Sequence, residues 1–305
     1  MCLADKLALS PEGVVVERAD RDWILPGSST FAAQVRETDA RYVLLNDVTA
    51  ACRSVSAEWA DLLAPSNPRL RAPLPHLWVE WTDADSRQEI GVLVQAADDG
   101  RSGSLRAFWN GEDGADVAQG EVLFDLDNPI SRKQRVDGRR LFPVGELPTR
   151  LEALEPHLAL AFDPSWEEYF RTSSMGSAAL PFAAKSCGEK LLPDLLGALS
   201  FFALLGVQVP FRERAIDRGR LNNARSKAGK VALLDHVELA IGQPCTTAGD
   251  QGPGTGNRKN PRMHIVRGHL VRRRENVFWR GAHLRGLGNM DHAMPKTRIV
   301  RMHAG

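Results

Sequence analysis

The amino-acid sequence predicts an α+β protein: an antiparallel β-meander with packed helices and a basic C-terminal β-hairpin. Three observations support this prediction. Four short β-rich segments follow one another with turn-like sequences between them. Two longer segments have the spacing, or the continuous apolar character, of buried helices. The last 48 residues mix apolar with basic residues and hold five of the eight histidines.

The predicted meander consists of the segments 77–81, 90–96, 104–110 and 121–127. The stretches between them are rich in Gly, Asp and Ser, which favour hairpin turns. In the first segment, LWVEW, alternation places Trp78 and Glu80 on one face of the strand and the intervening residues on the other. Glu80 is a candidate general acid, although a single Glu on a strand is more often solvated or paired.

Helices are predicted before and after the meander. In the segment 46–64, apolar residues recur at helical spacing. After Pro148 the sequence LEALEPHLALAF also favours a helix, and the longest apolar stretch, 191–209, follows it. That stretch contains Pro193 and Asp194, so a buried core helix is a better interpretation than a membrane span.

The composition is typical of a soluble globular protein, with 305 residues, 43% of them hydrophobic and 25% charged. The N-terminal sequence lacks the basic and apolar regions of a secretory signal. The four cysteines show no CxxC spacing, so we expect reduced thiols in a bacterial cytoplasm, with Cys187 a weak candidate nucleophile. We expect no cofactor and no metal, because nothing completes a tetrahedral ligand set around His264 and His269.

The charge is strongly asymmetric along the chain. Residues 211–305 hold 19 Lys and Arg and 7 Asp and Glu, a net +12, whereas residues 1–210 hold 20 and 31, a net −11. The prediction is therefore an acidic α+β body over 1–250 with a basic segment at 211–230, and a Gly-rich linker or loop over 251–260. A basic hairpin motif over 261–305 would pack on the body and add strands to it. Such a basic end suits an anionic partner, most often nucleic acid, while docking on the acidic body is the alternative.

Alternation along the tail predicts that Arg267, His269 and Trp279 meet on one hairpin surface. Three interpretations of this surface stay open. It could bind RNA, with guanidinium groups on phosphates and Trp279 stacking on a base. It could cleave RNA without a metal, with His264, His269 and His283 as candidate acid and base. It could also be purely structural. The predicted nucleic-acid-binding residues are Arg262, Arg267, His269, Arg272, Arg273, Trp279 and Arg280 in the tail, and Arg225, Lys227 and Lys230 in the body.

The tail sequence RMHIVRGHLVRRRENVFWRGAHLRG resembles the C-terminal Arg-Gly-His motif of a family known mainly from phages and mobile elements. The studied member of that family is an anti-CRISPR protein directed against the type V-A effector nuclease. The upstream sequences RLNNARSKAGKVALLDHVEL and, more weakly, LPHLWVEW are similar to segments of uncharacterised phage relatives. The positions that match the motif are His264, Ile265, Arg267, Gly268, His269 and Trp279.

The resemblance implies a regulator that recognises the emerging N-terminal peptide of its target during translation, with loss of the message. The resulting hypothesis is a co-translational regulator. It would bind a nascent polypeptide or target protein through its body and RNA or the ribosome through its tail, without a membrane. The alternatives are a metal-independent, toxin-like ribonuclease and a non-enzymatic phage protein that inhibits by binding another protein.

Overall fold

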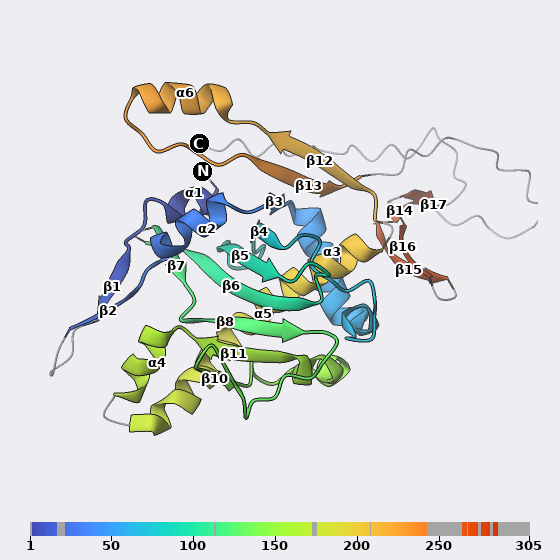
Figure 1. The fold of residues 1–305 in the computed structure, drawn as a ribbon. Coiled ribbons are helices and arrows are strands. Elements are labelled where there is room, and N and C mark those ends of the chain that lie inside the picture. The colour runs from blue at the N-terminus through green and yellow to red at the C-terminus, as the bar shows by residue number, and fades with distance from the viewer. Residues whose placement is uncertain are drawn as a thin grey trace, which may run out of the picture. The chain divides into compact units, whose positions relative to one another are not determined.

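A computed structural model describes residues 2–16, 22–112, 114–172, 176–207, 209–242, 264–266, 268–273, 276–280 and 283–285. The chain divides into two compact units, Met1–Ile241 and Gly242–Gly305. Helices and strands are mixed in the first unit (Figure 1), which confirms the predicted α+β class.

Eleven strands of the described chain form one mixed sheet. In order across the sheet these are β12 (Phe211–Ile216), β13 (His236–Ile241), β3 (Ala40–Leu44), β4 (His76–Thr82), β5 (Glu89–Ala96), β6 (Ser102–Gly111), β8 (Gly120–Asp125), β11 (Leu158–Phe162), β10 (Arg139–Phe142) and β9 (Arg135–Val136), with β7 (Gly114–Val117) pairing with β6. The helices of the first unit are α1 (Leu3–Leu7), α2 (Ala32–Arg36), α3 (Asn46–Glu58), α4 (Pro164–Arg171), α5 (Ala179–Gly206) and α6 (Gly219–Lys227). The remaining elements are the ribbon of β1 (Gly13–Val16) and β2 (Trp23–Pro26) and the 3-10 segments η1 (Ser28–Phe31), η2 (Ala60–Leu63), η3 (Thr149–His157) and η4 (Gly176–Ala178).

The predicted meander is confirmed. Strands β4, β5, β6 and β8 are antiparallel neighbours. Between β6 and β8 the chain adds a strand that the sequence did not predict, because β7 folds back on β6 with Gly114 opposite Gly111. Glycines at this point allow the tight reversal, and Gly114 adopts a positive φ of 134°.

One part of the sheet, inside the antiparallel edge pair of β12 and β13, is parallel. Strand β3 runs parallel to both β4 and β13, and α3 connects β3 to β4. Parallel neighbours need a crossover connection, which the predicted helix over 46–64 supplies as α3 followed by η2. This helix is therefore confirmed, although its role in a parallel pair was not predicted.

The predicted helix after Pro148 is wrong in its second half. The first half forms η3, but Leu158–Phe162 is the strand β11, which lies between β8 and β10. All five residues of β11 are buried. A strand covered on both faces is a continuous apolar run, and periodicity cannot distinguish such a run from a buried helix.

The long apolar helix is confirmed as α5, which begins at Ala179 and ends at Gly206. Fourteen of its residues are buried, and α5 packs on α3 and on the strands β5, β6 and β11. Within the described ranges, no helix combines the length and apolar character that crossing a membrane would need.

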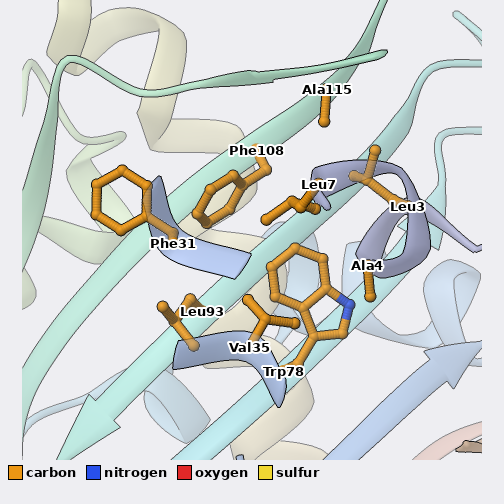
Figure 2. Packing of buried hydrophobic residues seen from close by; sticks show 9 residues of the cluster. All are labelled: Leu3, Ala4, Leu7, Phe31, Val35, Trp78, Leu93, Phe108 and Ala115. Carbon is orange, nitrogen blue, oxygen red and sulfur yellow. The ribbon is translucent and has the colours of Figure 1, made fainter. Parts of the chain in front are cut away.

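The meander has helices on both of its faces. On one face, α1 and α2 cover a cluster in which the rings of Trp78 and Phe108 lie 5.3 Å apart (Figure 2). On the other face, Trp81 points to α5, where a methyl group added to Gly197 would lie 3.1 Å from the indole. Trp78 and Trp81 therefore belong to two different hydrophobic layers.

Glu80 fixes α1 to the sheet. Its carboxylate is 7% exposed and accepts hydrogen bonds from the backbone N–H groups of Leu3 (3.3 Å) and Ala4 (3.1 Å) and from Trp78 Nε1 (2.8 Å). Burial raises the pKa of this carboxyl group. Because both oxygens are occupied by these donors, the structure assigns Glu80 a packing role instead of the predicted candidacy as a general acid.

A buried ion-pair network joins β6 and β8 to the start of α4. The guanidinium group of Arg106 is bidentate on Asp163, with distances of 2.9 and 2.7 Å, and lies 4.4 Å from the centroid of the Phe31 ring. Glu121 lies 3.6 Å from Arg106 and accepts a hydrogen bond of 2.6 Å from Arg139. Removing one partner of such a buried pair is strongly destabilising, because it leaves the other charge uncompensated.

The predicted C-terminal hairpin is confirmed in the second unit. Its strands are β14 (His264–Val266), β15 (His269–Arg273), β16 (Asn276–Arg280) and β17 (His283–Arg285). Antiparallel pairing joins β15 to β16 and β14 to β17. Two residues separate β14 from β15, and two residues separate β16 from β17. The register is thus continuous, as in one long ribbon. The described strands of this unit pair with one another. The expectation that the tail packs on the body and adds strands to it stays a prediction.

Candidate nucleic-acid interface

The basic segment of the first unit, 211–230, contains β12 and α6. Together with β13 these elements form what we call the arm. The two strands form an antiparallel pair at one end of the sheet, and α6 lies in the connection between them, at the outer side of the unit (Figure 1). No residue of α6 is buried. The helix therefore gains little from hydrophobic packing, which normally supplies most of the stability of a short helix.

Hydrogen bonds to the backbone fix α6 instead. The side-chain amide of Asn222 donates to the carbonyl oxygen of Leu233 and accepts from its N–H, each at 2.8 Å. The guanidinium Nε of Arg225 donates to the carbonyl oxygen of Val231 at 2.8 Å. Gly229 ends the segment with a positive φ of 66°, the left-handed conformation that closes helices. These contacts hold a polar helix in a defined position.

Most of the cations on this arm point to solvent. Arg214 pairs with Glu238 at 3.3 Å. Within the described residues, no ion pair is recorded for the exposed side chains of Arg212, Arg220, Lys227 and Lys230. Arg220 and Lys227 are seven positions apart in one helix, so they lie two turns apart on the same face.

The arm changes the predicted set of binding residues. Lys227 and Lys230 are exposed, as binding requires, but Arg225 is half-buried and its Nε is used to hold the chain. Sequence reasoning missed Arg212 and Arg220. The signal that could have identified Arg220 is its seven-residue spacing from Lys227, which places the two side chains on one face of a helix.

The hairpin has two chemically different faces, which follow from its register. Residues opposite one another in an antiparallel pair share a face. Leu270 lies opposite Trp279 and Arg272 opposite Val277, and on this face Leu270 and Val277 are buried. The ring of Trp279 also covers Gly268, where an added methyl group would lie 2.7 Å from the indole.

The other face of the hairpin is the more basic one. It carries His269 opposite Arg280 and Val271 opposite Phe278, and Arg273 follows at the end of the strand. The side chains of His269, Arg273 and Arg280 are exposed, and Phe278 is half-buried. This face combines cations with an aromatic ring, which is a common arrangement for binding single-stranded nucleic acid.

The prediction that His269 and Trp279 share a surface is therefore wrong. They lie on opposite faces of the ribbon, and the contact of Trp279 with Gly268 indicates a packing role for the indole. Arg272, which was predicted to bind nucleic acid, is exposed but belongs to the Trp279 face. Arg262 and Arg267 lie outside the described residues, so their predicted role stays a prediction.

The three candidate catalytic histidines lie on three different strands. The backbone partner of His264 is Arg285, that of His269 is Arg280, and that of His283 is Val266. No histidine is paired directly with another in these ladders. Cys187 is also a poor nucleophile, because burial raises the pKa of its thiol to about 11.

Comparison of the chain with models of protein families, with curated proteins and with solved structures finds no match. In the part of the chain that the structure describes, no group of three or more His, Cys, Asp or Glu side chains is placed to hold a metal ion.

Proposed function

We propose that the protein is an RNA-binding regulator of the anti-CRISPR-like kind that its C-terminal motif suggests. In this proposal it acts in the bacterial cytoplasm and lowers production of a target protein. It recognises the target's nascent peptide and contacts RNA or the ribosome through its basic surfaces. No catalytic step is assigned to the chain itself.

The observation that carries the proposal is α6, a helix that buries no side chain yet is fixed by backbone-directed hydrogen bonds. Its exposed face presents Arg220 and Lys227 two turns apart. Cations held in this way neutralise phosphates and release counterions without reading a base sequence. The exposed His269, Arg273 and Arg280 of the hairpin supply a second surface of the same chemistry.

The test is binding of a fluorescent single-stranded RNA of mixed sequence, measured by anisotropy over a range of salt concentrations. We expect the Arg220→Gln/Lys227→Gln variant to bind more weakly. Its salt slope should be shallower by about 1.4, since each lost phosphate contact on a single strand contributes about 0.7. The Arg273→Gln/Arg280→Gln variant should behave in the same way.

A matched control removes two exposed arginines from elsewhere on the body, Arg36 and Arg171, and should leave the salt slope unchanged. Equal effects of all three double variants would show only that total charge matters and would refute a defined interface. Cleavage of the RNA by the purified protein would instead support the ribonuclease alternative.

The regulatory part of the proposal is tested by sedimentation with ribosomes from expressing cells, with and without puromycin. We expect association that puromycin abolishes and that the two interface variants weaken. Association that survives puromycin would exclude recognition of a nascent chain. RNA binding without any ribosome association would leave the interface standing but would remove the co-translational role.

A further inference from the structure

A small pocket opens between α3, α5 and the β4–β5 hairpin, on the face of the sheet opposite α1. Its volume is about 140 Å³. This is smaller than the 300–1,000 Å³ typical of sites for drug-sized ligands and cofactors, so the pocket suits a group the size of one side chain. Its floor is closed by buried residues and its mouth is formed by exposed ones. The floor consists of Leu44, Cys52, Trp81, Ile90 and Asp194, and the mouth includes Arg53, Thr82, Ala84 and Pro193.

Asp194 is the polar group in this floor. Its side chain comes from the middle of the apolar helix α5, and the residue is only 7% exposed. One oxygen, Oδ2, accepts a hydrogen bond of 2.8 Å from Trp109 Nε1. Among the described residues, no donor is recorded for the other oxygen, Oδ1. Oδ1 is not one of the described atoms that are fully buried without a partner, so a donor from outside can reach it.

The charged groups around Asp194 do not supply that donor. The ammonium group of Lys190, one turn earlier on α5, lies 4.2 Å from the centroid of the Trp109 ring. Arg53, on α3, points to two carboxylates, at 3.3 Å from Asp85 and 3.8 Å from Asp83. Asp83 itself lines the pocket and adds negative charge. The lining thus favours a cation that comes from outside.

The remaining walls narrow the choice of cation. Trp81 lines the pocket, and Gly197 adds no side chain where the indole approaches α5. An aromatic face attracts a cation, and apolar walls suit an alkyl stem. Guanidinium groups favour carboxylates with both oxygens available for forked pairing, whereas an ammonium group binds one oxygen as a compact charge. Only Oδ1 is available here.

We propose that this pocket binds a primary alkylammonium group, which lays its stem against Trp81 and Ile90 and donates to Asp194 Oδ1. The group can be the side chain of a lysine in another protein or a free alkylamine. The inference is independent of the proposed RNA-binding function, because it uses a different face of the first unit.

The experiment follows the indole N–H signals of the full-length, ¹⁵N-labelled protein by NMR during titration. The probes are cadaverine, as a free amine, and N-acetyl-lysine N-methylamide, as a lysine side chain. n-Pentanol tests the alkyl stem without charge, and N-acetyl-arginine N-methylamide tests a guanidinium group in place of the ammonium group. We expect saturable shifts of the Trp81 and Trp109 signals with at least one of the two amines, and at least tenfold weaker binding of n-pentanol and of the arginine derivative.

Two variants and a change of pH test the geometry. Asp194→Asn keeps an acceptor for Trp109 but removes the charge, and should weaken amine binding at least tenfold. Gly197→Ala keeps the charge and narrows the pocket, and it is compatible with the helix because Ala is the better helix former. It should also weaken binding. The control Glu58→Gln removes an exposed charge from the same helical layer and should have no effect. Lowering the pH from 7.5 to 5 should weaken binding about tenfold as the carboxyl group is protonated.

Binding of cadaverine alone would identify a free amine as the ligand, and binding of the lysine derivative would identify a protein side chain. Shifts that n-pentanol reproduces, or that survive in Asp194→Asn, would overturn the proposal. The absence of saturable shifts with both amines would overturn it as well.

Discussion

Replacing Asp194 by Asn should stabilise the protein at neutral and alkaline pH but not in acid. Burial raises the pKa of this carboxyl group from 3.8 to about 6, opposed by the hydrogen bond from Trp109 and by the charge of Lys190. One pKa unit corresponds to 1.36 kcal/mol, so the ionised side chain lowers the free energy of unfolding by about 3 kcal/mol at pH 8.

The pH window follows from the direction of the shift. Below pH 3.8 the carboxyl group is protonated in both states and contributes nothing. As the pH rises from 3.8 to about 6, the unfolded chain releases its proton first, so the stability of the wild type falls relative to Asp194→Asn. Above pH 6 the difference is complete. At pH 4 it should be well below ~1 kcal/mol.

The assay is urea unfolding of both proteins at pH values from 4 to 8, followed by tryptophan fluorescence. If the hydrogen bond from Trp109 to the amide is weaker than that to the carboxylate, the difference in unfolding free energy between the two proteins shifts equally at every pH. The test therefore depends on how this difference changes with pH. Glu58→Gln should change stability by less than about 0.5 kcal/mol at every pH. A difference between Asp194→Asn and the wild type that does not vary with pH would refute the reasoning, because it would mean that Asp194 titrates normally.

Three further changes test other parts of the structure. Gly268→Ala should destabilise the hairpin by about 1–3 kcal/mol, because the new methyl group meets Trp279. Limited proteolysis should then cleave the tail faster, while the melting temperature of the body stays the same. An unchanged rate of proteolysis would exclude this contact. Asp163→Ala should lower the free energy of unfolding, measured in urea, by about 3–5 kcal/mol, because Arg106 stays buried without its partner. A decrease of less than about 1 kcal/mol would contradict this expectation. Asn222→Ala should speed amide exchange within α6 and leave the sheet protected, whereas unchanged exchange would show that this residue does not hold the helix.

Local signals explain which parts of the fold the sequence could predict. The meander, α3, α5 and the hairpin each have their own periodicity or turn residues, and all four are present. The parallel pairing of β3 with β13 could not be found in this way, since it joins residues about 195 positions apart, such as Tyr42 and Val237. Strand β11 was mistaken for helix because its five buried residues have no alternation.

The candidate interface was predictable in composition but not in geometry. The charge asymmetry identified the basic segments, and Lys227, Arg273 and Arg280 are exposed as expected. The side of the ribbon on which each residue lies depends on the register, which the loop between β15 and β16 sets. The observed register pairs Arg273 with Asn276 and so separates His269 from Trp279. Pairing shifted by one residue would have placed them on the same face.

Asp194 illustrates a signal that is visible in the sequence but has no meaning until the structure supplies its surroundings. A carboxylate in the most apolar helix argues against a membrane span, and sequence reasoning could go no further, because Trp109 is 85 residues away along the chain. If the side chain served only to accept the indole N–H, an uncharged amide would do so without the ionisation cost of about 3 kcal/mol. Asp194 instead lines a pocket whose wall also includes Trp81. Binding sites often contain a carboxylate that lowers the stability of the protein by itself and gains a cationic partner when the ligand binds. The amine titration distinguishes such a binding role of Asp194 from a purely structural one.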